Sequence, residues 1–151
     1  MTDGRAVSTN VEDIIAIQQL ISRYAIVVDA QDWDALDPLF TNDAQLDFST
    51  FGGPVGSLTE IKQFLAATLP GFARTQHMMG LPSITLDGDR ANSRTSCNNP
   101  MLPPGRDGSS PVWLIGLWYD DELVRGDEGW KFRRRTQTRC YTLTGFVDSP
   151  L

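Results

Sequence analysis

The spacing of the apolar residues changes about halfway along this chain, and that change limits the folds open to it. From Ile14 to Val28, apolar side chains recur at intervals of three and four residues, which places them on one face of a helix. After Thr75 the pattern alternates in runs separated by turn-forming pairs such as Asp87-Gly88. Helices that precede antiparallel hairpins predict an α+β domain in which the helices cover one face of a curved sheet.

Capping residues place the ends of the predicted helices. Thr9 and Glu12 have the spacing of a capping box, so the first helix is expected to run from Val11 to about Asp29. Residues 1–8 are expected to be flexible, and residues 9–147 to form one domain. The other predicted elements are a short helix from Asp32 that ends before Phe40, a strand over 44–48, a helix that begins with a second capping box at Ser57 and Glu60, and strands over 75–86, 90–99, 112–125 and 130–143.

The charge balance excludes several classes of partner. The 151 residues include 19 acidic and 13 basic side chains, for a net charge of −6. This balance argues against binding to nucleic acids or anionic membranes, because both require positive charge. No stretch approaches the roughly 20 apolar residues of a membrane-spanning helix, and Met1–Arg5 lack a signal-peptide pattern. With only Cys97 and Cys140 as thiols, the sequence predicts a cytoplasmic protein with reduced cysteines.

The usual ligands for metals and nucleotides are missing from the sequence. His77 is the one histidine, and no cysteines cluster near it, so no metal site is expected. Neither a G-x-G-x-x-G nor a G-x-x-x-x-G-K-[ST] loop is present for a dinucleotide or phosphate. We therefore expect a protein without a cofactor that binds a small molecule, since a curved sheet closed by helices encloses a natural pocket.

His77 and Asp29 are unusual for their positions. A lone strand histidine is often structural, but histidine is also the side chain whose ordinary pKa, about 6.5, suits proton transfer near neutral pH. Asp29 lies at the edge of an apolar stripe near the C-terminal end of a helix, where the helix dipole disfavours a carboxylate. Two interpretations stay open: Asp29 is a solvated helix terminus, or it holds the His77 imidazole in one tautomer.

Two motifs carry a resemblance to a known family. The first, Asp29–Leu36, reads D-A-Q-D-W-D-A-L, and the second, Thr75–Gly80, reads T-Q-H-M-M-G. Together with Gly129-Trp130-Lys131-Phe132 near the C-terminus, they resemble the SnoaL-like, nuclear-transport-factor-2-like superfamily, and scytalone dehydratases in particular, over residues 12–143. The resemblance implies a single SnoaL-like α+β barrel domain over residues 9–147, with a cone-shaped, mixed sheet packed against N-terminal helices.

The resemblance also implies roles for three residues. His77 would be the general base and Asp29 its orienting partner, as the same pair occurs in hexachlorocyclohexane dehydrochlorinase and bile-acid dehydratase. Tyr24 is similar in placement to a pocket tyrosine of bile-acid dehydratase, whose hydroxyl would polarise a carbonyl or assist a leaving hydroxyl. A core tyrosine on the helix stripe is the alternative for Tyr24.

The chain departs from scytalone dehydratases at positions that would contact the substrate. Phe48 stands where that family has a tyrosine, Ile115 corresponds to an asparagine, and a second histidine is missing. Phe51 and Tyr119 are further candidates for an aromatic-binding pocket, although core packing would explain them as well. These departures predict a small, largely hydrophobic cyclic or aromatic substrate rather than scytalone itself.

Arginines on the last predicted strand are candidates for binding an anion. Simple alternation puts three of them on the outer, solvated face, opposite Trp130 and Phe132: Arg133, Arg135 and Arg139. A β-bulge would turn Arg139 into the pocket, where it could hold a leaving group or an anion, as an arginine does in some relatives.

The predicted activity is a cofactor-free elimination. His77 would remove a proton next to an activating group, and a leaving group, water in the first instance, would depart from the neighbouring carbon. Three alternatives stay open: a lyase that releases formaldehyde from aryl propanediols, a SnoaL-like polyketide cyclase acting as an isomerase, and a non-catalytic ligand-binding or accessory subunit. Relatives form dimers or trimers, so a homo-oligomer is expected by resemblance.

Overall fold

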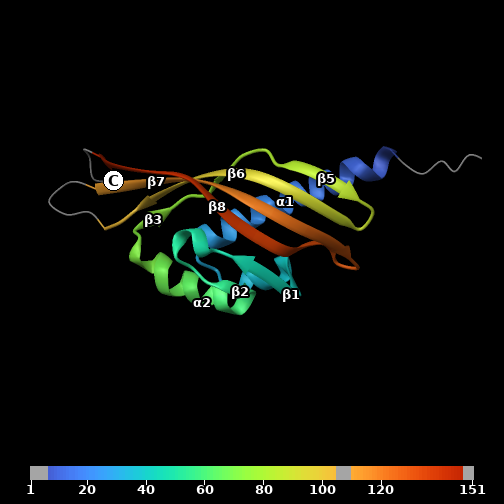
Figure 1. The fold of residues 1–151 in the computed structure, drawn as a ribbon, viewed down its shortest axis with the longest axis horizontal. Coiled ribbons are helices and arrows are strands. Elements are labelled where there is room, and N and C mark those ends of the chain that lie inside the picture. Colours follow the sequence, from blue (N-terminus) through green and yellow to red (C-terminus); the bar gives the residue numbers. More distant parts are fainter. Residues whose placement is uncertain (1–6, 105–109, 148–151) are drawn as a thin grey trace, which may run out of the picture.

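Figure 1 shows the fold as a computed structural model, which describes residues 7–104 and 110–147. Two α-helices, α1 (Val7–Asp29) and α2 (Leu58–Thr68), are joined to the sheet by 3₁₀ segments at Asp34–Leu39, Ser49–Phe51 and Leu69–Gly71. The strands are β1 (Phe40–Asp47), β2 (Val55–Ser57), β3 (Arg74–Thr75), β4 (Met78–Met79), β5 (Ser83–Asp87), β6 (Arg90–Leu102), β7 (Ser110–Gly126) and β8 (Gly129–Val147).

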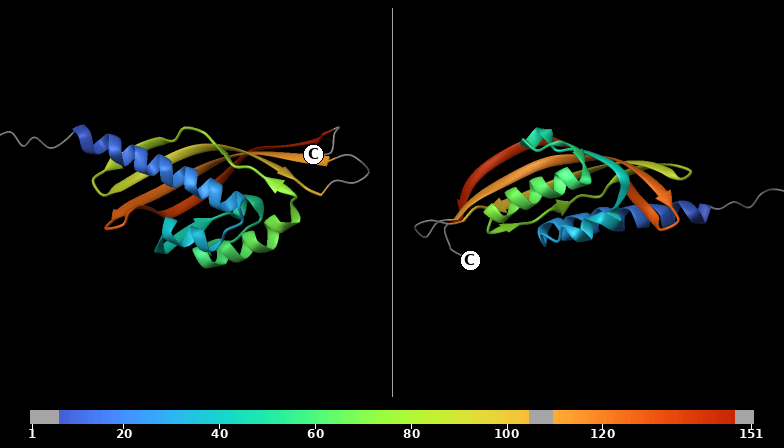
Figure 2. Two further views of the ribbon diagram at one scale, coloured as in Figure 1. Left: turned by 180° about the vertical axis from the view of Figure 1, so that it is seen from behind. Right: turned by 90° about the horizontal axis from the view of Figure 1, so that it is seen from below.

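All strands belong to one sheet. Its order is β2-β1-β8-β7-β6-β3, and β4 and β5 also pair with β6. β1 runs parallel to β8 while the other pairs are antiparallel, so the sheet is mixed. The long strands arch over α1 and α2, which both lie on the concave side (Figure 2). This arrangement confirms the predicted single α+β domain with a curved mixed sheet packed against N-terminal helices.

The capping boxes predict the start of α2 correctly but not the start of α1. Ser57 and Glu60 form the predicted capping box of α2, with the Ser57 backbone N–H donating to Glu60 Oε2 over 2.7 Å. Helix α1 begins at Val7 rather than Val11, so Thr9 lies inside it and not at its cap. Of the segment 1–8 that was expected to be flexible, residues 1–6 lie outside the described part of the chain and the last two are helical.

The predicted continuous strand over 75–86 is wrong. The segment is divided into β3, β4 and β5, which pair with successive parts of β6. The first break occurs because the His77 backbone N–H donates to the Asp29 carboxylate on α1 instead of to a neighbouring strand. The second follows Gly80, where a side chain would collide with Ser96, and includes Pro82, which has no N–H to donate.

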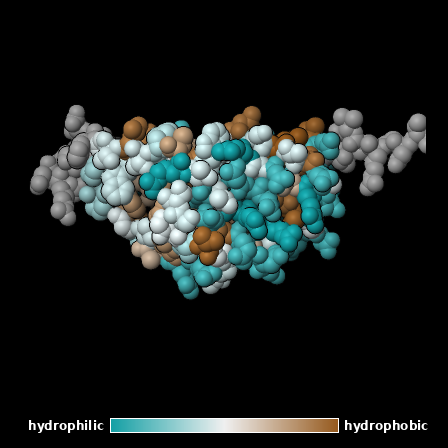
Figure 3. All heavy atoms as spheres, in the orientation of Figure 1, coloured by the Kyte–Doolittle hydropathy of each residue, from teal (hydrophilic) through white to brown (hydrophobic). Residues whose placement is uncertain are grey.

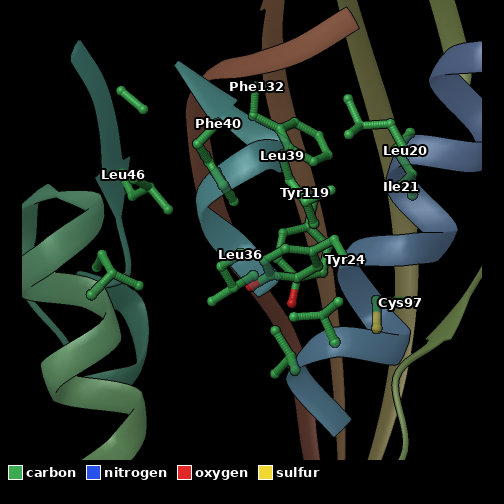
Figure 4. Close-up of a cluster of buried hydrophobic side chains, with 14 of the residues drawn as sticks. Leu20, Ile21, Tyr24, Leu36, Leu39, Phe40, Leu46, Cys97, Tyr119 and Phe132 are labelled. Atoms are coloured by element: carbon green, nitrogen blue, oxygen red, sulfur yellow. The ribbon is translucent and has the colours of Figure 1, made fainter. Parts of the chain in front are cut away.

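The apolar stripe of α1 forms the centre of the core. Ile17, Ile21 and Tyr24 are almost completely buried, and Figure 4 shows Tyr24 beside aromatic side chains of the sheet. The Tyr24 ring packs edge-on against Phe40 and Tyr119, with centroid separations of 6.2 and 5.7 Å. The stripe therefore places the C-terminal half of α1, including Asp29, against the inner face of the sheet.

Two bulges in β8 change which side chains face inward. Leu123 pairs with Phe132 while Glu122 pairs with Arg134, so Arg133 is an extra residue in β8. This bulge puts Arg135 on the inner face together with Phe132, and the predicted outward position of Arg135 is wrong. Alternation alone could not show this, because one inserted residue reverses the face of every residue after it.

The outer face of the sheet is mostly hydrophilic. Figure 3 views the molecule from the side opposite α1, where hydrophilic residues predominate and hydrophobic ones are scattered. Ion pairs between strands lie there, including Arg134 with Glu122 and Arg94 with Asp120. Neither α1 nor α2 is long and apolar enough to cross a lipid bilayer.

Candidate active site

Asp29 and His77, which are 48 residues apart in sequence, are in direct contact. Nδ1 of His77 lies 2.7 Å from Asp29 Oδ1, and the His77 side chain is only 6% exposed. The Asp29 carboxylate receives two further hydrogen bonds, from the Thr75 hydroxyl at 3.0 Å and from the His77 backbone N–H at 2.7 Å. One carboxylate at the end of α1 therefore holds both the backbone and the ring of His77.

These contacts favour the ionised form of Asp29. Burial alone would raise the pKa of Asp29, but the hydrogen bonds from His77 and Thr75 and the charge on His77 lower it below its usual value. An ionised carboxylate can only accept, so the proton between the two side chains belongs to Nδ1 of His77. In this tautomer Nε2 carries no proton and can accept one from a ligand.

Asn99 on β6 faces this second ring nitrogen. Its Nδ2 lies 3.2 Å from Nε2 of His77, and the Asn99 side chain is buried. The Asn99 carbonyl oxygen makes no hydrogen bond to any described residue. The sequence does not single out Asn99, because this residue lies among the polar residues of β6 and nothing in the chain order pairs it with His77.

His77 and Asn99 open onto a cavity of about 330 Å³ between the sheet and α2. Its walls are mainly aliphatic and aromatic, which suits a small apolar ligand. The candidate residues from the sequence that line this cavity are Tyr24, Phe48, Phe51, His77, Ile115, Tyr119 and Arg139. Asp29 lies behind His77. Lining residues that were not predicted from the sequence include Phe72, Asn99, Met101, Leu117, Gln137 and Thr142.

The cavity differs in character at its two ends. Tyr24 and Tyr119 are buried at the deep end, where the Tyr24 ring centre lies 6.5 Å from that of His77. Arg139 is exposed at the other end, and its Nη2 donates to the Thr50 carbonyl over 2.7 Å. The bulge at Arg133 thus gives Arg139 the inward register that a β-bulge was expected to produce, and Arg139 lies over the Phe51 ring at the mouth.

The described residues contain no group of three or more histidine, cysteine, aspartate or glutamate side chains positioned to hold a metal ion. Cys97 and Cys140 are both free thiols. The polar groups that line the cavity are an imidazole, two phenols, amides, hydroxyls and one guanidinium, with the Asp29 carboxylate behind the imidazole.

Comparisons with known proteins place the chain in a family. Residues 9–136 match the SnoaL-like domain family. An uncharacterized protein of Mycobacterium tuberculosis, Rv2910c, is 41% identical over 131 residues, which cover 87% of this chain and 88% of that protein.

Solved structures of more distant proteins share the fold. A candidate scytalone dehydratase from Novosphingobium aromaticivorans superposes with a TM-score of 0.81 at 21% identity, covering 95% of both chains. The hexachlorocyclohexane dehydrochlorinase LinA-type3 from Novosphingobium barchaimii gives a TM-score of 0.76 at 19% identity, covering 89% of this chain and 91% of that one. The fold, its inner cavity and the match over most of its length together show that this chain belongs to the SnoaL-like family of the nuclear-transport-factor-2-like superfamily.

Proposed function

We propose that the protein is a cofactor-independent lyase that eliminates a leaving group, water in the first instance, from a small hydrophobic cyclic or aromatic substrate. The observation that carries this proposal is the 2.7 Å contact between Asp29 and His77 beside an apolar cavity. Asp29 keeps the ring in the tautomer whose Nε2 can act as a base, and its charge stabilises the imidazolium that forms. The fold neighbours named for dehydration and dehydrochlorination support the same reaction class.

His77 alone carries the proton in this reaction. Nε2 removes a proton from a carbon next to a carbonyl or similar activating group, and the C–H electron pair becomes the new carbon–carbon π bond. The bond from the neighbouring carbon to the hydroxyl breaks, and the hydroxide leaves as water with the proton that Nε2 had taken. Acid–base catalysis of this kind contributes about 10²- to 10⁴-fold, and exclusion of water by the apolar walls adds to it.

The other lining residues supply binding. Phe48, Phe51 and Ile115 present apolar surface to the substrate, which agrees with the loss of the polar groups that scytalone would need. Arg139 at the mouth is placed to meet a polar or anionic substituent, since its guanidinium already uses one donor on Thr50 and remains exposed. Tyr24 at the deep end is placed to bind an oxygen of the substrate.

Deuterium exchange tests the base without knowledge of the leaving group. The probe is 2-tetralone, a bicyclic ketone with acidic C–H bonds, incubated in deuterated buffer. We expect the protein to accelerate exchange, His77→Ala to lose at least about 10²-fold of that rate, and Asp29→Asn to be slower than the parent but still folded by circular dichroism. Retention of more than about a tenth of the parental rate by folded His77→Ala would contradict the role of His77.

Product analysis then identifies the reaction. A panel of cyclic β-hydroxyketones, chlorinated cycloalkanes and aryl propanediols is screened by mass spectrometry for release of water, hydrogen chloride or formaldehyde. Release of any of these groups supports a lyase. Conversion without loss of mass indicates the cyclase or isomerase alternative, and binding without any conversion or exchange indicates a ligand-binding subunit.

A further inference from the structure

A charged pair is completely buried behind the deep end of the cavity. Asp121 on β7 and Arg135 on β8 are direct partners across the hairpin, and both side chains are 0% exposed. Nε and Nη2 of Arg135 each donate to a different Asp121 oxygen over 2.7 Å. Burying two charges costs several kcal/mol per ion, and apolar replacements of such pairs are often at least as stable. Stability alone therefore gives no reason for this pair.

The Arg135 guanidinium lies against the aromatic side chains that form the floor of the cavity. Its central carbon is 4.1 Å from the centre of the Tyr24 ring and 4.4 Å from that of Tyr119. A cation over the face of a phenol attracts its π electrons, so the hydroxyl becomes a stronger hydrogen-bond donor. Asp121 does not use the whole guanidinium, because Nη1 of Arg135 has no hydrogen-bond partner among the described residues.

A hydrogen-bond chain gives the hydroxyl protons a direction. Nε2 of Gln137 lies 3.4 Å from the Tyr119 hydroxyl, and an amide nitrogen can only donate. Tyr119 therefore accepts from Gln137, and its own hydroxyl proton is free for the neighbouring Tyr24, whose ring centre lies 5.7 Å from that of Tyr119. With the Tyr119 proton directed to the Tyr24 oxygen, the Tyr24 proton is left for an acceptor inside the cavity. Such chains strengthen each member by polarisation.

Electrostatics favour negative charge at the same place. Burial raises the pKa of Tyr24, while the Arg135 charge opposes that rise. The pKa of Arg135 would be lowered by burial, but the Asp121 charge and hydrogen bonds raise it above its ordinary value, so the guanidinium stays charged. A ligand oxygen on Tyr24 therefore meets a donor backed by a fixed positive charge.

We infer that Arg135, held by Asp121, is a positioning residue that makes the Tyr24 hydroxyl an oxyanion-binding donor at the floor of the cavity. The ligand is then a cyclic ketone, enone or phenol whose oxygen accepts the Tyr24 proton. The inference rests on the proposed elimination and deepens it, because removal of a proton beside a carbonyl places negative charge on that oxygen. It selects carbonyl-activated substrates over haloalkanes, which have no such oxygen.

The ionisation of a bound phenol measures this effect without catalysis. The probe is 4-nitrophenol, whose yellow phenolate reports the charged form when it binds. Arg135→Met combined with Asp121→Leu removes both charges and leaves neither partner buried alone. We expect its bound 4-nitrophenol to have an ionisation constant about tenfold lower than in the parent, a difference of one pKa unit. The matched control, Arg134→Met with Glu122→Leu, removes the adjacent exposed pair on the outer face and is expected to leave the constant unchanged.

Equal ionisation constants in the parent and in the Arg135→Met, Asp121→Leu variant would overturn the inference, and so would failure of the parent to bind 4-nitrophenol. If the double variant does not fold, Tyr24→Phe gives the second measurement, since it keeps the ring and loses only the hydroxyl. An unchanged ionisation constant in folded Tyr24→Phe would overturn the inference as well.

The same titrations in His77→Ala separate this inference from the proposed function. The ionisation effect of Arg135 is expected to persist without the base. If the parent shows the ionisation effect but does not exchange 2-tetralone, the proposed elimination fails while the oxyanion site stands. If the parent exchanges 2-tetralone but shows no ionisation effect, the oxyanion site fails while the proposed base stands.

Discussion

At the scale of single residues, the contacts around His77 are unequal. Asp29 accepts from both the ring and the backbone of His77, whereas Asn99 offers one longer contact, 3.2 Å from Nε2. The carbonyl oxygen of Asn99 is buried without a partner, which costs stability. Because Asn99 costs stability while it faces the ring nitrogen that we propose as the base, we predict that it serves a ligand rather than the fold.

Replacement of Asn99 separates these two effects. Asn99→Leu keeps the size of the side chain and removes the unpaired oxygen, so we expect an equal or higher Tm together with a loss of activity of roughly fivefold to tenfold, the worth of one hydrogen bond of about 1 kcal/mol. Thermal unfolding and the rate of 2-tetralone exchange measure the two quantities. A lower Tm with unchanged exchange would show that Asn99 serves only the fold.

Asn99→Asp provides the matched change in charge. A carboxylate beside Nε2 favours the protonated imidazole, so the pH at which exchange activity appears is expected to move upward. Each pKa unit of that movement corresponds to 1.36 kcal/mol of interaction. A pH profile identical to that of the parent would mean that this side chain does not sense the state of His77.

At the scale of elements, Asp29 fastens α1 to the break between β3 and β4. Three of its hydrogen bonds reach that segment, so the same carboxylate that orients His77 also interrupts the strand. The bond to the His77 amide replaces one that a continuous strand would have made to β6. The irregular strand and the candidate site therefore have one physical cause.

Acid is expected to release this junction. The pKa of Asp29 is lower in the folded chain than its ordinary value of 3.8, because hydrogen bonds from His77 and Thr75 outweigh the effect of burial. A group with a depressed folded pKa stabilises the protein above the unfolded pKa, and that contribution is lost as the pH falls through the folded value. Asp29→Asn should therefore be less stable than the parent at pH 6, by roughly 2 kcal/mol, the worth of hydrogen bonds to a charged group.

Urea unfolding of the parent and of Asp29→Asn at several pH values measures this contribution. The difference between the two proteins is expected to shrink as the pH falls below 3.8. Other carboxyls with lowered pKa values, such as Asp47 and Glu60, are present in both proteins and cancel in the comparison. A difference that stays constant with pH would show that the charge of Asp29 adds nothing to stability.

At the scale of the whole molecule, the arched sheet and its helices enclose a sealed core next to the cavity. Cys97 lies on the inner face of β6 and is 2% exposed, whereas Cys140 is exposed on β8. Burial raises the pKa of the Cys97 thiol to about 12. The reactivity of Cys97 therefore reports on solvent access to the interior, and that of Cys140 reports on the outer surface.

Thiol labelling tests whether the molecule is closed. At pH 8 a disulfide reagent should react quickly with one thiol per chain and with two in denaturant. In Cys140→Ser, the fast reaction is expected to disappear, because the remaining Cys97 thiol is both buried and protonated. Rapid reaction of Cys97 in native Cys140→Ser would show that the inner face opens frequently to solvent.

The sequence by itself determined the class of the fold. The change from spacings of three and four to alternation predicted helices followed by long strands, and α1, β6, β7 and β8 agree with it. The capping box at Ser57 predicted the start of α2 because its hydrogen bonds are formed by residues three apart. The same sequence also singled out His77 and Asp29, by the rarity of histidine and by the awkward position of a carboxylate on an apolar stripe.

Only the tertiary structure decided what those residues contact. The bulge at Arg133 placed Arg135 in the core, and the break at His77 divided a predicted strand. Both depend on partners that are distant in the chain, such as Asp121 for Arg135 and Asp29 for the His77 amide. The spacing of apolar residues predicts which face of a segment is buried on average. Whether a strand bulges or breaks depends instead on distant buried polar groups that need a hydrogen-bond partner.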